Sequence, residues 1–145
     1  MQSPPMDDAR QFPFKRVDAA TGDASLLPML PLSLAHAGRT LSVEGLVDTG
    51  SAVNVLPFEV GVALGADWQQ QAIQVRLTGN LAREDARVLV VSAIVGDFPP
   101  VRLAFAWTKA RTVPVILGQV NFFMAFDACF FRSQGYFTIR PSSKL

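Results

Sequence analysis

The sequence is poor in the residues that most often build metal sites and nucleophilic catalytic pairs. It contains one cysteine, Cys129, and one histidine, His36. A single cysteine excludes an internal disulfide, and one His with one Cys leaves too few ligands for zinc and no Cys–His or Ser–His pair. Phosphate-binding and dinucleotide-binding glycine motifs are also missing. We therefore expect no metal and no cofactor, a buried Cys129 and a surface-turn His36.

The sequence also lacks an excess of charge and any long apolar run. Thirteen Lys and Arg against twelve Asp and Glu give a net charge of +1, without a basic cluster, so nucleic acid is not an expected partner. The uninterrupted apolar runs, such as Val88–Val91, are far shorter than the roughly 20 residues of a membrane helix. The polar N-terminal stretch does not resemble a secretory signal, which predicts a cytoplasmic protein.

Apolar residues are abundant instead. Half of the 145 residues are hydrophobic and eleven are Phe. This apolar content is enough for one core, and it is high for a small monomer whose surface must stay hydrated. We expect a partner to cover part of this apolar surface. Residues 1–20, which contain Pro4, Pro5 and Pro13, are predicted to form a flexible tail that ends in a short strand at FPFKRV. Residues 21–145 are predicted to form the packed domain.

Short apolar segments separated by turn residues predict an all-β barrel or sandwich. Alternating residues from Leu30 to Val47, with Gly38 between them, predict a β-hairpin. Pro57 and Gly65 bracket a short helix. Further strands are expected at AIQVRLTGN, ARVLVVSAIVG, PVRLAFAW, VPVILG and YFTIRP, with a second short helix at QVNFFMAF.

Two motifs stand out against this background. Asp48, Thr49, Gly50 and Ser51 follow a hydrophobic run, so the glycine turn places one carboxylate at the end of a strand. Ile116-Leu117-Gly118 follows much later and continues as QVNFFMAFDACFFRSQGYFTIRP. D-T-G alone is a weak signal, but the distal I-L-G at this separation makes it strong. Together these residues resemble the single-domain, retropepsin-like (retroviral-type) aspartic proteases found in bacteria, over about residues 30–141.

The resemblance implies a fold, an assembly and an activity. Pepsin-like enzymes carry two D-T-G loops in one chain, whereas the retroviral type carries one and forms a twofold homodimer. The second catalytic carboxylate is then Asp48 of another copy, across an isologous interface. Two carboxylates about 3 Å apart share one proton, so one activates a water as general base while the other acts as general acid.

The resemblance also implies roles for the residues around Asp48. Thr49 would bond across the twofold axis to the backbone of the other copy, and Gly50 keeps the turn tight. Ser51 would hydrogen-bond the outer carboxylate oxygen. Ile116, Leu117 and Gly118 would form a dry wall behind the loop. Many members pair an Arg after the second glycine with an Asp beyond D-T-G-[AS]; Gln119 and Ala52 replace both, which bears on dimer affinity.

The family also needs a flap, a mobile hairpin that closes over the substrate. The best candidate is VRLTGNLARE, with Thr78, Gly79 and Asn80 at or near the tip, because Gly-Asn tolerates positive φ. An ordinary surface hairpin has the same pattern. Five phenylalanines spaced by three and four residues favour a packed helical face in the core or dimer; they are Phe122, Phe123, Phe126, Phe130 and Phe131.

The leading hypothesis is a homodimeric aspartic endopeptidase that binds an extended peptide, with apolar side chains preferred beside the cleaved bond. One alternative is a catalytically silent module of the same fold that binds peptides or dimerises. Another is a monomeric β-domain whose D-T-G is a plain turn. The intact Asp48-Thr49-Gly50-Ser51 loop argues against the silent module, because such a module needs no carboxylate there. Light scattering that shows a single chain at high concentration would support the monomeric β-domain.

Overall fold

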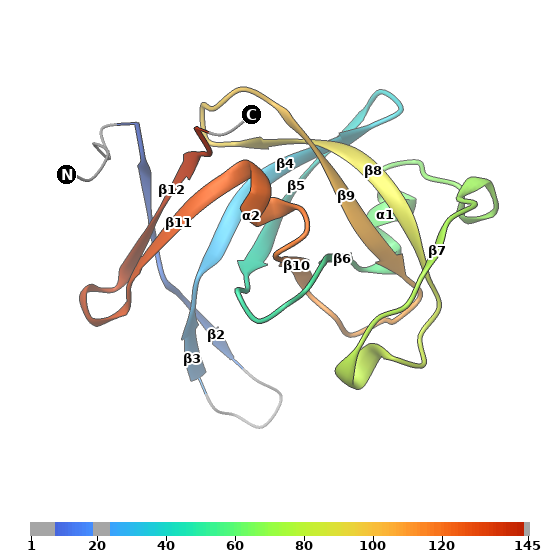
Figure 1. Ribbon diagram of the computed structural model, residues 1–145, viewed down its shortest axis with the longest axis horizontal. Coiled ribbons are helices and arrows are strands. Elements are labelled where there is room, and N and C mark those ends of the chain that lie inside the picture. The colour runs from blue at the N-terminus through green and yellow to red at the C-terminus, as the bar shows by residue number, and fades with distance from the viewer. Residues whose placement is uncertain (1–7, 19–23, 144–145) are drawn as a thin grey trace.

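The computed structural model describes residues 8–18 and 24–143. Strands dominate it, with two short helices and three single turns of 3-10 helix in the described residues (Figure 1). The strands are β1 Arg10–Pro13, β2 Lys15–Asp18, β3 Ala24–Leu27, β4 Met29–His36, β5 Arg39–Val47, β6 Asn54–Leu56, β7 Gln74–Val75, β8 Ala86–Val95, β9 Val101–Thr108, β10 Val115–Leu117, β11 Phe126–Phe131 and β12 Tyr136–Pro141. The helices are α1 Phe58–Ala63 and α2 Phe122–Ala125, and the 3-10 turns are Trp68–Gln70, Gly79–Leu81 and Arg132–Gln134.

Six strands close into a barrel. Their order is β4, β5, β10, β6, β9 and β8, and β8 pairs back onto β4, so the ring has no free edge. Alternate residues of the long strands point inward, as Leu30, Leu32 and Leu34 of β4 do, and all three are buried. Strand β7 pairs with β8 outside the ring. The predicted all-β barrel with short helices is therefore confirmed.

The predicted hairpin is present as β4 and β5. Its register runs from Met29 opposite Leu46 to His36 opposite Arg39. Ala37 and Gly38 both have positive φ, 48° and 81°, which matches the two-residue turns that suit the twist of paired strands. His36 lies at the end of β4 beside this turn and is half-buried, with Nδ1 3.4 Å from the carbonyl oxygen of Leu64.

The short strand expected at FPFKRV, at the end of the predicted tail, is present as parts of two strands, β1 and β2. Arg10–Pro13 pairs antiparallel with β12, and Lys15–Asp18 pairs with β3, so the chain has regular structure well before residue 20. The reason is non-local: β12 offers one edge to β11 and its other edge to β1. Residues 1–7 and 19–20 of the predicted tail lie outside the described residues.

Two predictions about the Phe-rich segment were wrong. Only Phe122–Ala125 is helical, and Phe126–Phe131 forms strand β11, because pairing with β12 overrides a spacing that also fits a helix. Phe126 and Ala128 pack against the core, whereas Cys129 is exposed. In a strand, successive side chains alternate between faces, so Cys129 lies on the opposite face of this edge strand.

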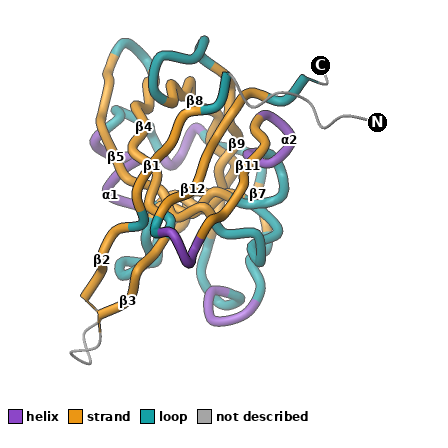
Figure 2. The backbone as a smooth tube through the Cα atoms, turned by 90° about the vertical axis from the view of Figure 1, so that its left-hand side faces the viewer, coloured by secondary structure: helices purple, strands orange, loops and turns teal. Residues whose placement is uncertain are grey.

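Two segments project from the same end of the molecule. They are the β2–β3 pair and the loop between β7 and β8, which contains the 3-10 turn Gly79–Leu81 (Figures 1 and 2). The loop that follows β5 lies between them in the view of Figure 1. No helix in the described part of the chain is long and apolar enough to cross a membrane.

Candidate active site

Asp48 lies in the loop between β5 and β6, and β10 holds this loop from behind. Strand β10 runs parallel to β5, with Leu117 opposite Val47, and pairs antiparallel with β6 through Ile116 and Val55. The two predicted motifs therefore meet: I-L-G lies between the strands that enter and leave D-T-G. Val47 at the end of β5, Leu56 of β6 and Leu117 of β10 all belong to the hydrophobic core, so the loop stands on the barrel core.

The backbone fixes the Asp48 carboxylate. The backbone amide of Asp48 donates a hydrogen bond to the carbonyl oxygen of Leu117 at 3.0 Å. The backbone amide of Ser51 donates to the Asp48 carbonyl oxygen at 3.1 Å. The Gly50 amide donates to Asp48 Oδ1 at 2.9 Å. A Cβ on Gly50 would lie 3.3 Å from that oxygen, closer than most side chains tolerate. Asp48 is half-buried, so its carboxylate remains accessible.

The backbone behind the loop leaves no room for a side chain at Gly118. A Cβ at this position would lie 2.4 Å from the carbonyl oxygen of Val53 and 2.8 Å from that of Ser51, so only glycine fits. Leu117 is fully buried and Ile116 is half-buried. The three residues thus lie where the predicted wall requires them.

Asn54 is a positioning residue that the sequence analysis missed. It is fully buried, and its Oδ1 accepts a 2.8 Å hydrogen bond from the Gly118 amide. Its Nδ2 donates to the Ala104 carbonyl oxygen at 3.1 Å and to Asn121 Oδ1 at 2.9 Å. One side chain thereby joins the loop to β9, β10 and the start of α2. The only sequence signal is a polar residue among apolar neighbours in SAVNVL, where a buried amide must find partners.

Gln119 and Ser51 bond differently from the expected pattern. Gln119 Nε2 donates to the Thr49 carbonyl oxygen at 2.8 Å, and its backbone amide donates to the Ser51 carbonyl oxygen at 2.9 Å. The Ser51 hydroxyl donates to the Val53 carbonyl oxygen at 2.8 Å, whereas a bond to Asp48 was expected. The single hydroxyl proton is used within the turn, which corrects that prediction. The Thr49 residue is exposed.

The candidate flap differs in detail from the predicted hairpin. Of the strand expected at AIQVRLTGN, only Gln74–Val75 is present. Residues 76–85 form a loop before β8. Gly79 has a φ of +65°, as a turn residue should, but Gly79, Asn80 and Leu81 form a 3-10 turn. The side chain of Asn80 lies outside the described residues. Thr78 precedes this turn and faces the hollow beside Asp48.

A hollow of about 600 Å³ lies between the loop of Asp48 and the candidate flap. Its base is mainly apolar and includes Val53, Val55 and Ile116. Charged side chains also border it; they are Asp48, Arg76, Glu84 and Arg111. A carboxylate that lines a hollow together with apolar and cationic side chains is an arrangement typical of ligand-binding and active sites.

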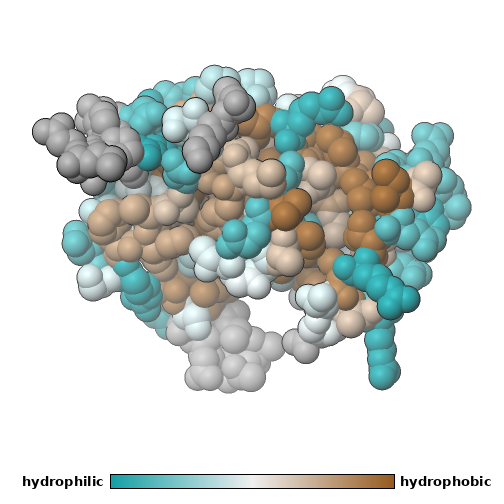
Figure 3. Space-filling model, in the orientation of Figure 1, coloured by the Kyte–Doolittle hydropathy of each residue, from teal (hydrophilic) through white to brown (hydrophobic). Residues whose placement is uncertain are grey.

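A second hollow, of about 410 Å³, lies on the other side of Asp48 and Thr49. Aromatic and aliphatic residues line most of it, including Phe14, Leu27 and Phe130. Phe130 is 40% exposed, and apolar residues gather over β11 and β12 in the left half of Figure 3. This apolar face therefore reaches the candidate catalytic loop directly.

Among the described residues, no group of three or more His, Cys, Asp or Glu side chains could hold a metal ion. The arrangement at Asp48 offers a carboxylate, backbone amides and an adjacent hollow. These groups can orient a water molecule and an amide bond, provided that a second acid is supplied.

The sequence matches no family model and no curated protein. The structure is similar to the crystal structure of a retropepsin-like aspartic protease from Rickettsia conorii. The TM-score is 0.58, the sequence identity is 15%, and the match covers 90% of each chain. At this identity the likeness shows the fold: the chain has a retropepsin-like barrel.

Proposed function

We propose that this protein is an aspartic endopeptidase that works as a twofold homodimer. The observation that carries the proposal is the meeting of two distant motifs. The Asp48 amide bonds to Leu117, and Gly118 packs against the Ser51 and Val53 carbonyls, beside a hollow large enough for a peptide. The retropepsin-like fold supports the same conclusion.

The chemistry needs two carboxylates close together, and the D-T-G loop of each chain supplies one, Asp48. In the proposed dimer, the two Asp48 side chains share one proton. The ionised carboxylate takes a proton from a bound water as its oxygen attacks the substrate carbonyl carbon, and the protonated carboxyl gives its proton to the carbonyl oxygen. As the tetrahedral intermediate collapses and the C–N bond breaks, the carboxyl that took the proton of the water gives it to the leaving nitrogen, and the other carboxylate regains a proton from a hydroxyl of the intermediate. The Gly50 amide keeps Asp48 Oδ1 oriented throughout.

The second hollow is where the partner is proposed to dock. Because it is lined by Asp48 and Thr49, it lies beside any axis that brings two Asp48 residues together. Both edges of β12 are already occupied within the chain, by β1 and β11, so a partner strand cannot pair with β12. We assign the contact to the apolar face around Phe14, Leu27 and Phe130, because this face lies directly beside Asp48 and Thr49.

The substrate is proposed to bind as an extended strand in the hollow of about 600 Å³, below the loop that contains Thr78 and Gly79. Main-chain hydrogen bonds would then give affinity, and the apolar base formed by Val53, Val55 and Ile116 would receive an apolar side chain beside the cleaved bond.

The test is cleavage of a diverse peptide mixture from acid to neutral pH, read by mass spectrometry. Wild-type protein should produce new termini at defined positions, and Asp48→Asn should produce none because it cannot supply the acid–base pair. Equal cleavage by both proteins would contradict the proposal. No cleavage by either, with a dimer present in the same buffer, would favour the alternative of a peptide-binding or dimerisation module of this fold.

A further inference from the structure

Two arginines border the hollow beside Asp48. Arg76 lies at the start of the β7–β8 loop and Arg111 in the segment between β9 and β10, so they reach the same hollow from two elements. Both are exposed. Within the part of the chain that the structure describes, neither guanidinium makes a hydrogen bond or an ion pair.

Neighbouring cations are engaged in packing, which sets these two apart. Arg87 donates to the Trp68 carbonyl oxygen at 2.7 Å and lies over the Trp68 ring, with its guanidinium carbon 4.8 Å from the ring centroid. Lys109 lies over the same ring at 5.0 Å. These two cations stabilise the aromatic cluster around Trp68, whereas Arg76 and Arg111 contribute no such contact.

We propose that Arg76 and Arg111 select a peptide with an acidic side chain close to the cleaved bond. The inference rests on the proposed function, because the hollow that they border is the proposed substrate site. A carboxylate that enters the hollow can accept paired hydrogen bonds from a guanidinium, the geometry in which Arg recognises carboxylates. The apolar base and the arginines would thus favour a substrate that combines an apolar with an acidic residue.

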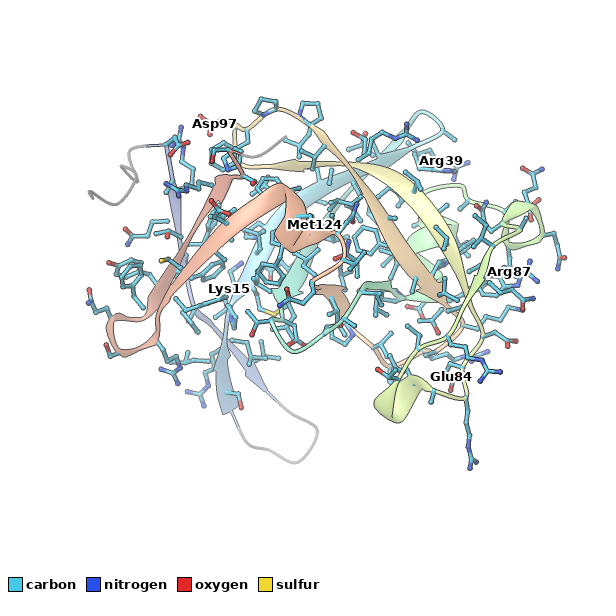
Figure 4. All side chains as sticks on the ribbon, in the orientation of Figure 1. Lys15, Arg39, Glu84, Arg87, Asp97 and Met124 are labelled. Carbon is cyan, nitrogen blue, oxygen red and sulfur yellow. The ribbon has the colours of Figure 1, made fainter. Side chains whose placement is uncertain are left out.

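The acidic groups in the hollow limit this preference without cancelling it. Glu84 borders the hollow from the β7–β8 loop, where Figure 4 labels it, and Asp48 lies at the catalytic loop. In the proposed dimer the two Asp48 carboxylates share a proton, which lowers the negative charge at the centre. Removing the Glu84 charge should therefore strengthen the acidic preference, the opposite of the effect of removing either arginine.

Twofold symmetry predicts where the acidic residues of the substrate should lie relative to the cleaved bond. A homodimer has two copies of this hollow, related by the axis that passes between the Asp48 residues. An extended peptide crosses both, so the acidic preference should appear at two positions equally distant from the cleaved bond, one on each side. A monomeric site would give the preference on one side only.

The experiment is a cleavage profile of a peptide library for wild type, Arg76→Glu and Arg111→Glu, read by mass spectrometry. Wild type should enrich Asp and Glu at the matched positions. Each charge reversal should lower kcat/KM for acidic peptides by roughly fivefold or more and shift the enrichment toward Lys and Arg. Glu84→Gln should raise the acidic enrichment. Arg102→Glu makes the same charge change at an exposed site on β9 outside the hollow and should leave the profile unchanged.

A second readout does not depend on turnover. Fluorescence anisotropy of the Asp48→Asn protein, with a labelled acidic peptide and its Asn/Gln counterpart, measures recognition alone. Tighter binding of the acidic peptide that is lost in Asp48→Asn/Arg111→Glu supports the inference. Equal binding of the two peptides, or a preference that survives both charge reversals, overturns it while leaving the proposed protease intact. Failure of wild type to cleave any peptide would instead overturn the proposed function.

Discussion

The side-chain amide of Gln119 donates a 2.8 Å hydrogen bond to the carbonyl oxygen of Thr49. This bond joins the residue after I-L-G to the middle of D-T-G. In the family pattern that the sequence resembles, an Arg at this position pairs with an Asp at the position of Ala52. Here a neutral amide makes a contact to backbone instead, so the loop is tied without a charge that would need a partner.

Replacing Gln119 by Ala should loosen the catalytic loop more than it destabilises the fold. Gln119 is exposed and water can replace the lost donor, so the free energy of unfolding should fall by less than about 1 kcal/mol. The turnover number should fall several-fold with little change in KM, because the carboxylate is less well oriented. Denaturant unfolding and steady-state kinetics measure both. An unchanged turnover number would show that this bond does not position the loop.

Replacing either of two glycines near Asp48 by Ala should have different effects: the change at Gly118 should lower stability, and the change at Gly50 should lower activity. Gly118→Ala places a methyl group 2.4 Å from the Val53 carbonyl oxygen and should cost roughly 2–3 kcal/mol of stability or prevent folding. Gly50→Ala meets only Asp48 Oδ1, at 3.3 Å, so it should fold normally and lose activity. Thermal unfolding and peptide cleavage, run on both variants, distinguish the two effects. A Gly118→Ala protein as stable as wild type would contradict the packing of β10 against the loop.

Much of this architecture could be predicted because its determinants are local. Gly38 marks the hairpin turn, and Pro57 and Gly65 bracket α1, whose C-terminal Gly65 has a φ of +77°. The D-T-G and I-L-G motifs identified the residues that meet at the site. Local patterns are also what sequence analysis reads best.

The missed features depend on contacts between distant segments. Residues 126–131 form the strand β11 because β12 offers them an edge. Nothing near Asn54 reveals that its amide meets Gly118, Ala104 and Asn121. The domain boundary and the cytoplasmic location stay predictions from the sequence.

The apolar face beside Thr49 should control dimer formation. Phe130→Arg places a charge in the proposed contact and should weaken self-association at least tenfold, as measured by sedimentation equilibrium. Ile94→Arg is a matched control, because Ile94 on β8 is 41% exposed and Phe130 is 40% exposed, but Ile94 lies away from that hollow. Equal weakening by both variants, or by neither, would place the interface elsewhere.

A pH-dependent contact joins β1 to the barrel. Arg10 donates to both carboxylate oxygens of Asp97, at 3.1 and 3.2 Å, and these hydrogen bonds hold the pKa of Asp97 below its ordinary value. A folded-state pKa below the unfolded one means that the stabilisation is present above the unfolded pKa and is lost as pH falls through the folded pKa. The Arg10 and Asp97 side chains are 44% and 70% exposed, so solvent screens the contact and its effect on stability should be small.

Carboxyl-carbon NMR titration of wild type and Arg10→Gln tests this contact. The pKa of Asp97 should rise toward its ordinary value in the variant, because the donors that favour the ionised form are reduced or lost. Identical titration curves in the two proteins would exclude the Arg10–Asp97 contact in solution.

If one active site takes Asp48 from two copies of the chain, a variant chain should inactivate the wild-type chain with which it pairs, and mixing wild type with Asp48→Asn measures this. After subunit exchange with a roughly ninefold excess of the variant, random pairing leaves about a tenth of the wild-type chains with a wild-type partner. Cleavage per wild-type chain should then fall to about that fraction of its value in a reference sample, in which an inert protein replaces the variant at the same concentration. Cleavage per wild-type chain that stays constant across the mixing series would contradict a shared site and identify each chain as acting alone.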